Sequence, residues 1–408
     1  MIKKAIIFLQ VFIGWLLAVP LSFLVPKQKN LWLFIGGGNG QFRDNVKYLF
    51  LYLHKQKPAD LTLYFLTENS QTRDDLNAKG LPVILYPRMT TVFKMLRASV
   101  VIVDNLTWIW NLKYHLLFDC CKVQLWHGCS IKSLELDNPN ELKKFNTWWK
   151  RIAVNASGRF PKYDFLLSTS SLNTEKIFLP AFRPKKIIEF GYPRNDVFFR
   201  QPDDLDLIGA DQACIDIVRS YTKKNHKTVL YAPTFRDTGS GNDFIEKEAL
   251  DIDKLNRFGQ ANRMLFVFKI HPFRKLEYDF RKADNVIRYA DADDVYPLLP
   301  SIDLLITDYS SIFFDFLFAD RPIVFFPYDY EKYISKDRRL KYDYAWITPG
   351  PKCYTQDQLQ ETVGRILYQG EDHFSLKRKE IMDLSFKQQE GNFSGHIFDF
   401  LNNDVLNR

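Results

Sequence analysis

Residues 304–315 combine an apolar run with hydroxyl and carboxyl groups in an order suited to phosphate chemistry. The run ends at Thr307 and Asp308, and Ser310 and Ser311 then open a second apolar stretch. A strand leading into a helix start would present unpaired backbone N–H groups beside two hydroxyls, which together can bind a phosphate. A serine that only caps the helix is the alternative, and serine caps are the commoner case.

Two histidines follow predicted strands, one in each half of the chain. Trp126, His127 and Gly128 come after an apolar run, and the glycine permits a turn that exposes the imidazole to a cleft. His271 and Pro272 repeat this arrangement after a second run. Imidazole titrates near neutral pH and suits a general base acting on a hydroxyl. A structural histidine is the alternative for either position taken alone.

Two turn-like segments carry an arginine. Residues 191–196 have the glycine, proline and asparagine content of a tight loop, which predicts that Arg194 is exposed. Residues 231–237 end another apolar run and predict an exposed Arg236, whose guanidinium could pair with a phosphate through two hydrogen bonds. A solvated surface arginine is the alternative for both. The glycines of residues 36–40 lack the spacing of a dinucleotide-binding loop.

Short apolar runs alternate with helical patterns along most of the chain, which predicts parallel sheets covered on both faces. A charged stretch over residues 200–227, with a helix near 212–221, separates two such series. We therefore predict an α/β protein with two facing Rossmann-like domains, followed by a helical segment at 373–408 that packs back across the junction. The expected strands are 31–35, 61–66, 83–86, 100–103, 122–125 and 165–168, then 228–232, 264–270, 286–289, 304–307 and 323–326.

The N-terminal residues 5–25 are almost wholly apolar, with lysines on both sides. A signal peptide would need a clearer small-residue cleavage site. A membrane-spanning helix needs about 20 residues, and a helix lying in the membrane interface is the third interpretation. We predict that residues 1–28 anchor the protein and keep the rest on the cytoplasmic face of the membrane, as a peripheral, monotopic or single-span protein.

Composition limits the partners. The 408 residues include 46% hydrophobic and 25% charged residues and carry a net charge of +8, which indicates a folded protein with an anionic partner. Nucleic-acid-binding signatures are absent from the sequence, so phosphate or anionic lipid is favoured over nucleic acid. The five cysteines form no C-x-x-C pair, which favours a reducing compartment. No cluster of carboxylates and histidines has clear metal-ligand spacing, so we predict no structural metal, and we expect no cofactor. A requirement for a divalent metal stays open.

Taken in order, these segments resemble the CDP-glycerol glycerophosphotransferase family of wall teichoic acid and capsule synthesis. The matching segments are 44–50, 126–128, 191–196, 231–237, 271–272, 307–316, 321–323 and 328–333. The resemblance implies a GT-B fold, monotopic membrane association and a CDP-glycerol donor. It also implies that residues 29–200 form the acceptor-side domain and residues 201–372 the domain that binds the CDP donor.

In a protein of this kind His127 would be the base that activates an acceptor hydroxyl. That oxygen attacks the β-phosphorus of the donor, and CMP leaves. His271, with Ser310 and Ser311, would hold the pyrophosphate. The resemblance further implies substrate contacts from Trp126, Gly128, Arg194, Asn195, Thr234, Arg236, Pro272, Asp294, Thr307 and Asp308. The acceptor would be a teichoic-acid-like, capsular or lipid-linked polymer precursor.

One departure is that Tyr289 and Ala290 stand where family members often carry a histidine ahead of the pair Asp293-Asp294. The size predicts a priming, short-chain or capsule transferase. The alternatives are a ribitol phosphate transferase using CDP-ribitol, a GT-B glycosyltransferase using a nucleotide sugar, and a basic membrane-surface scaffold without activity.

Overall fold

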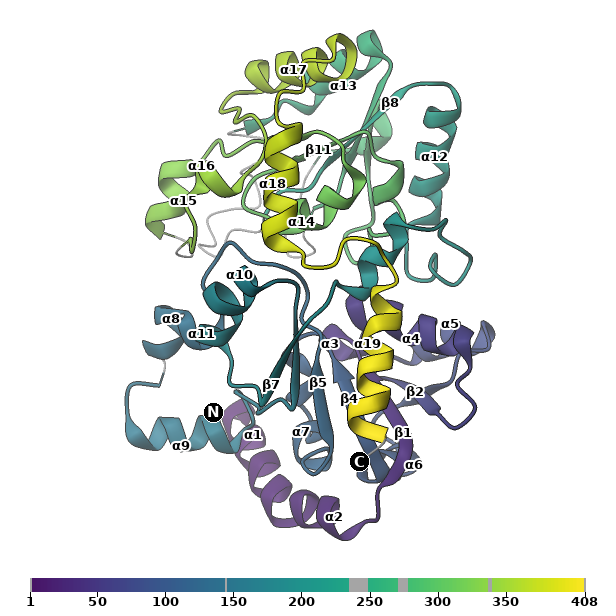
Figure 1. Ribbon diagram of the computed structural model, residues 1–408, viewed down its shortest axis with the longest axis vertical. Coiled ribbons are helices and arrows are strands. Elements are labelled where there is room, and N and C mark those ends of the chain that lie inside the picture. Colours follow the sequence, from purple (N-terminus) through teal and green to yellow (C-terminus); the bar gives the residue numbers. More distant parts are fainter. Residues whose placement is uncertain (1, 144, 235–248, 271–277, 337–339, 407–408) are drawn as a thin grey trace.

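The computed structural model describes residues 2–143, 145–234, 249–270, 278–336 and 340–406, and it contains two parallel sheets (Figure 1). The first sheet has the strand order β3-β2-β1-β4-β5-β6-β7. The second has the order β10-β9-β8-β11-β12. In both sheets the order reverses beside the strands that open the domain, which is where α/β folds place their ligands.

The strands of the first sheet are β1 (Gln28–Ile35), β2 (Thr62–Thr67), β3 (Val83–Leu85), β4 (Ala98–Val103), β5 (Cys121–Gln124), β6 (Phe165–Ser168) and β7 (Lys186–Glu189). Those of the second are β8 (Lys227–Tyr231), β9 (Met264–Phe268), β10 (Val286–Arg288), β11 (Leu304–Thr307) and β12 (Ile323–Phe325). Every strand predicted from the apolar runs is present. The sequence did not reveal β7, a strand at the sheet edge that buries only Ile188 fully.

The helices that cover the first sheet and its edges are α3 (Gly37–Gly40), α4 (Asp44–Gln56), α5 (Ser70–Ala78), α6 (Met89–Arg97), α7 (Lys113–Leu116), α8 (Pro139–Lys143), α9 (Trp148–Ala156), α10 (Ser171–Asn173) and α11 (Leu179–Ala181). Around the second sheet lie α12 (Gln212–Lys223), α13 (Ile252–Asn262), α14 (Ile312–Phe316), α15 (Tyr330–Lys336), α16 (Tyr344–Ile347) and α17 (Gln356–Gly364). Strand β9 is apolar along its whole length, and β4 is apolar from Val100 to Val103, because both faces are buried beneath helices.

The chain ends in α18 (Ser375–Ser385) and α19 (Phe393–Leu401), which lie on different domains (Figure 1). Helix α18 contacts the short helix η9 (Leu317–Ala319) of the second domain, and α19 packs on α4 of the first. The Asp196 carboxylate accepts hydrogen bonds from the backbone N–H groups of Phe393 and Ser394, at 2.8 and 3.1 Å, and so fixes the start of α19. The exact domain boundaries stay a prediction.

The N-terminus forms α1 (Ile2–Ile13), a π-helical turn η1 (Gly14–Ala18) and α2 (Val19–Leu24), which lie against the first domain. Residues 7–24 are long and apolar enough to cross a membrane by length and composition. Gly14, Ala18 and Ser22 are buried at a spacing of four residues, so one face of the helices packs on the protein. The Trp15 indole donates a hydrogen bond to the Ala156 carbonyl at 2.8 Å, which ties the helices to the end of α9.

Candidate active site

The turn after β5 presents His127 in an unusual backbone conformation. Trp126 has φ +57° and Gly128 has φ +126°, a region open to glycine and strained for other residues. The Trp126 N–H donates to the Gln124 side chain at 2.9 Å, and the Trp126 carbonyl accepts from the Asn45 amide at 2.7 Å. Side chains from β5 and α4 therefore hold the backbone N–H and the carbonyl of Trp126.

The His127 side chain is exposed, and its Nδ1 is held by the backbone. Its Nδ1 lies 3.0 Å from the backbone carbonyl of Asp104, which follows β4. A carbonyl can only accept, so Nδ1 carries the proton and the lone pair of the neutral ring is on Nε2. The Trp126 indole stacks on the imidazole with ring centroids 4.2 Å apart and limits its rotation. This is the arrangement expected of a base that takes a proton from a hydroxyl.

The segment after β11 carries the predicted phosphate site. Thr307 and Asp308 are buried and form hydrogen bonds within the protein. The Thr307 hydroxyl donates to the Ala232 carbonyl at 2.8 Å, and the Asp308 carboxylate accepts from the Thr234 N–H at 2.8 Å. Ser310 and Ser311 are half-buried. The Ser311 side chain makes no capping bond to α14, so the role of a simple helix cap does not apply to it. The helix that follows, α14, has only five residues, so its dipole is small. A phosphate at this position would therefore be bound mainly by the two serine hydroxyls.

The two segments meet at the junction between the domains. A Cβ atom placed on Gly128 would lie 3.6 Å from the Ser311 hydroxyl and 2.5 Å from Nη2 of Arg194. The turn that carries His127 and the serine pair are therefore neighbours across the junction, although 183 residues separate His127 from Ser310 (310 − 127). Only glycine fits at position 128.

Arg194 is buried, which corrects the exposed position predicted from its turn. The side chain is 3% exposed and lies in η5 (Pro193–Phe198). Its guanidinium pairs with Asp44 and with Asp315, each at 2.7 Å, so its terminal nitrogens are engaged inside the protein. Asn195, beside it, is also fully buried. A substrate contact from either residue stays a prediction, and neither presents a solvent-facing side chain.

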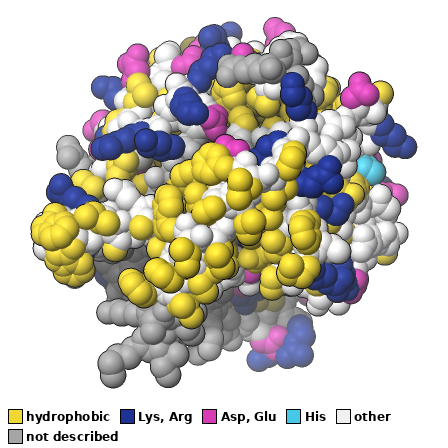
Figure 2. Space-filling view, turned by 90° about the horizontal axis from the view of Figure 1, so that it is seen from below, with side chains coloured by type: hydrophobic (Ala, Val, Ile, Leu, Met, Phe, Trp, Pro, Cys, Tyr) yellow, Lys and Arg dark blue, Asp and Glu magenta, His cyan; other side chains and the backbone are white. Residues whose placement is uncertain are grey.

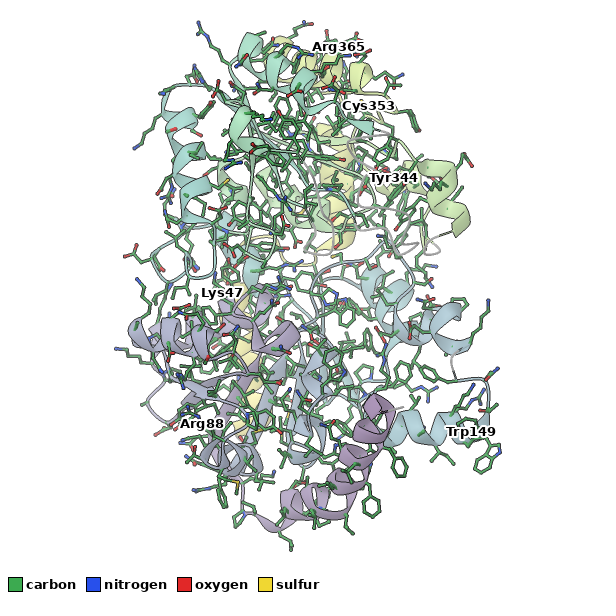
Figure 3. All side chains as sticks on the ribbon, turned by 180° about the vertical axis from the view of Figure 1, so that it is seen from behind. Lys47, Arg88, Trp149, Tyr344, Cys353 and Arg365 are labelled. Atoms are coloured by element: carbon green, nitrogen blue, oxygen red, sulfur yellow. The ribbon has the colours of Figure 1, made fainter. Side chains whose placement is uncertain are left out.

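Asp294 also lies inside the junction. Its carboxylate accepts from the Lys47 ammonium and the Tyr48 hydroxyl, both at 2.8 Å, and Lys47 in α4 is fully buried. Lys47 further donates to the carbonyls of Asp206 and Ile208, at 2.6 and 2.8 Å. Figure 3 labels Lys47 at the level where the two sheets approach each other. Asp294 thus joins the second domain to the first, and its predicted substrate contact stays untested.

Tyr289, in the region where a histidine was expected, has a structural role. The Tyr289 side chain is buried, and its hydroxyl donates to the Asp294 carbonyl at 2.5 Å and accepts from the Asp211 N–H at 3.0 Å. It therefore supports the loop that holds Asp294. Nearby, Lys269 donates to the carbonyls of Ala290 and Asp291, and burial lowers the pKa of Lys269 to about 8.

Asp104 is a site residue that was not predicted from the sequence. Its carbonyl orients His127, and its buried carboxyl accepts from the Val46 N–H at 3.3 Å. Burial raises the pKa of Asp104 well above its usual range, and the nearby Asp44 carboxylate raises it further. The signal was available, because Asp104 directly follows an apolar run and so lies at the carboxyl end of a parallel strand.

Three of the predicted site residues, His271, Pro272 and Arg236, lie outside the described residues. Within the described part of the chain, no group of three histidine, cysteine, aspartate or glutamate side chains is arranged to hold a metal ion.

Comparisons with known proteins agree with this architecture. A family model described as CDP-Glycerol:Poly(glycerophosphate) glycerophosphotransferase matches residues 17–403. The teichoic acid poly(glycerol phosphate) polymerase of Bacillus subtilis (strain 168) is 30% identical over 356 residues, which are 84% of this chain and 44% of that protein. The teichoic acid poly(ribitol-phosphate) polymerase of Bacillus spizizenii is 27% identical over 381 residues, 90% of this chain and 56% of that protein. The chain therefore spans about half the length of these two relatives.

A solved structure shares the fold. One structure of the wall teichoic acid polymerase TagF superposes with a TM-score of 0.74 at 23% identity and covers 99% of this chain and 98% of that chain. The predicted GT-B-like architecture of two facing α/β domains is confirmed by this likeness and by the two parallel sheets.

Proposed function

Since this chain belongs to the CDP-glycerol:poly(glycerophosphate) glycerophosphotransferase family, we propose that it moves glycerol phosphate from CDP-glycerol onto a hydroxyl of a surface polymer precursor. The acceptor is of the teichoic acid type, either lipid-linked or polymeric, and the second product is CMP. The family match and the likeness to the poly(glycerol phosphate) polymerase of Bacillus subtilis support this reaction.

The observation that carries the proposal is the exposed imidazole of His127, on a turn whose Gly128 lies next to the Ser311 hydroxyl. With Nδ1 bound to the Asp104 carbonyl, Nε2 can accept the proton of an acceptor hydroxyl. The oxygen forms a bond to the β-phosphorus, the bond from that phosphorus to the oxygen bridging to CMP breaks, and CMP leaves with the bond's electrons. Phosphoryl transfer of this kind depends mainly on positioning and on stabilising charge.

The serine hydroxyls would bind the donor pyrophosphate from the second domain. The roles predicted for His271, Arg236 and Pro272 on the same group belong to this proposal. Trp126 and Gly128 shape the turn that holds the base, and Thr234 and Asp308 hold the loop after β8 against that after β11. Ribitol phosphate from CDP-ribitol is a second candidate substrate, since one relative is a poly(ribitol-phosphate) polymerase.

We further propose that the protein lies on the cytoplasmic face of the membrane without crossing it. Along residues 7–24 only 22% of the helix is buried, and the exposed side chains include Phe8, Phe12, Leu16, Phe23 and Leu24. Helix α9 adds Trp148, Trp149 and Ile152 to the same end of the molecule. Figure 2 shows apolar side chains gathered over this end with lysines and arginines around them. A helix packed along the domain surface with its outer face apolar suits insertion parallel to the membrane.

The reaction is tested by measuring CMP release from the purified full-length protein. CDP-glycerol or CDP-ribitol is supplied with a membrane extract as acceptor, and the variants are His127→Ala and His373→Ala. We expect acceptor-dependent CMP release from CDP-glycerol that is lost in His127→Ala and kept in His373→Ala, whose histidine is exposed just before α18. CMP release from CDP-ribitol alone would identify CDP-ribitol as the donor in place of CDP-glycerol. No release from either donor, with an acceptor pool shown to be active, would refute the proposal and favour a nucleotide-sugar substrate.

A further inference from the structure

One guanidinium connects the three segments that build the site. Nη1 of Arg194 donates to the Asp44 carboxylate at 2.7 Å and to the His127 carbonyl at 3.0 Å. Nη2 donates to the Asp315 carboxylate at 2.7 Å. Asp44 begins α4 and His127 follows β5 in the first domain, whereas Asp315 lies in α14, directly after the serine pair of the second domain. Arg194 therefore contacts both the turn that carries His127 and the helix that follows Ser310 and Ser311.

The surroundings of Arg194 leave the side chain little freedom. Its guanidinium lies over the Tyr296 ring at 4.5 Å, and the Tyr296 hydroxyl donates to the same Asp315 oxygen at 2.9 Å. Gly128 closes the remaining side, where a Cβ would come within 2.5 Å of Nη2. A planar group held between two carboxylates and an aromatic ring is fixed in orientation as well as in position.

The backbone of Arg194 completes the same network. Its N–H donates to the Asn45 side-chain oxygen at 3.3 Å, and the Asn45 amide donates to the Trp126 carbonyl at 2.7 Å. The carbonyls of both Trp126 and His127 are thus held, one through Asn45 and one by Arg194 directly. Since Trp126 and Gly128 have positive φ angles, the turn needs such support to keep the imidazole in one place.

We propose that Arg194 is a positioning residue that sets the distance between the His127 base and the donor phosphate held at Ser310 and Ser311. This inference rests on the proposed phosphoryl transfer. Arg194 acts through the His127 backbone and through Asp315, and its guanidinium binds these protein groups in place of a substrate phosphate. Lysine cannot replace it, because one ammonium cannot present planar, paired donors to two carboxylates and a carbonyl.

The kinetic test compares Arg194→Lys and Asp315→Asn with a matched control, Arg378→Lys. Arg378 is also buried and forms a paired contact with Asp372, at 2.9 and 2.6 Å, but it lies in α18 and its partner Asp372 is not a site residue. We expect Arg194→Lys to lower kcat about 100-fold, as a misplaced reacting group does, with KM for the CDP donor changed less than about threefold. Asp315→Asn should lower kcat in the same way, and Arg378→Lys should not. A raised KM with unchanged kcat would overturn the proposal in favour of direct donor binding.

A second measurement does not depend on turnover. In protein labelled with ¹⁵N-histidine, the His127 ring signals are identified by their loss in His127→Gln. The wild type should show Nδ1 protonated and Nε2 unprotonated near pH 8, and Arg194→Lys and Asp315→Asn should show a mixture of the two tautomers. Unchanged His127 signals in both variants would overturn the positioning role. Absence of CMP release by the wild type would refute the proposed reaction instead, so the two failures are distinguishable.

Discussion

Replacing Gly128 by alanine tests the packing at the centre of the site. The residue has φ +126°, where a side chain costs about 1–3 kcal/mol in backbone strain. The new methyl would lie 2.5 Å from Nη2 of Arg194, so the guanidinium must leave Asp315 or the turn must move. Breaking a buried ion pair costs about 3–5 kcal/mol. Together the two effects could lower the free energy of unfolding by up to about 8 kcal/mol. Partial relaxation of the turn reduces this loss, and we expect the free energy of unfolding to fall by at least about 3 kcal/mol.

Gly80→Ala is the matched control for this substitution. Gly80 has φ +73°, and a Cβ added to it would have no atom within 4 Å, so the variant has the strain of a positive φ without the collision. We expect its free energy of unfolding to stay within about 1–2 kcal/mol of the wild type, with unchanged kcat. Midpoints of urea unfolding and rates of CMP release are measured for both variants. Equal midpoints and equal rates for Gly128→Ala and Gly80→Ala would refute the packing argument.

Three further variants test other parts of the account. Lys47→Met leaves the buried Asp294 carboxylate without its cation and should lower the free energy of unfolding by about 3–5 kcal/mol. The control is Lys185→Met, which removes an ion pair with Asp164 in which the lysine side chain is 75% exposed, and it should change the free energy of unfolding by less than about 1 kcal/mol. Urea midpoints that fall equally would contradict this. Asp104→Asn should gain stability relative to the wild type as pH rises from about 4 towards 8, because burial raises the pKa of Asp104 above its unfolded value and ionisation then disfavours the folded state. A stability difference that stays constant with pH would exclude the raised pKa. Trp148→Ser, at a side chain 74% exposed, should reduce co-sedimentation with anionic lipid vesicles, and unchanged sedimentation would remove α9 from the membrane surface.

The sequence predicted the sheets well because parallel strands buried on both faces appear as uninterrupted apolar runs. The run over residues 304–307 is β11 residue for residue. β7 escaped detection for the converse reason, since it is an edge strand that begins with Lys186 and ends with Glu189 and gives little contrast with a loop. His127 and the serine pair both follow strands, which predicts that they lie near the carboxyl ends of parallel strands, and the structure places Gly128 next to the Ser311 hydroxyl.

The sequence could not predict the environment of Arg194. Its turn composition indicates the local backbone, and a tight turn usually exposes its side chains to solvent. Burial of this arginine depends on Asp44 and Asp315, which are 150 and 121 residues away in the chain. Lys47 and Asp294 are separated by 247 residues and meet for the same reason. The pairs Arg194–Asp315 and Lys47–Asp294 form only when the two domains pack, and Arg194–Asp44 forms only when the first domain folds, so no local pattern records them.

The most direct test of the central claim follows both halves of the transferred group. The donor is CDP-glycerol labelled with ³²P at the β-phosphate, the phosphate attached to glycerol, and with ³H in the glycerol. The purified protein is given this donor and an acceptor, and the polymer product is separated and counted. Attack on the β-phosphorus predicts that ³²P and ³H enter the product in the ratio of the donor, that unlabelled CMP is released in equal amount, and that His127→Ala abolishes both. Transfer of ³H without ³²P, or undiminished transfer by His127→Ala, would contradict the account.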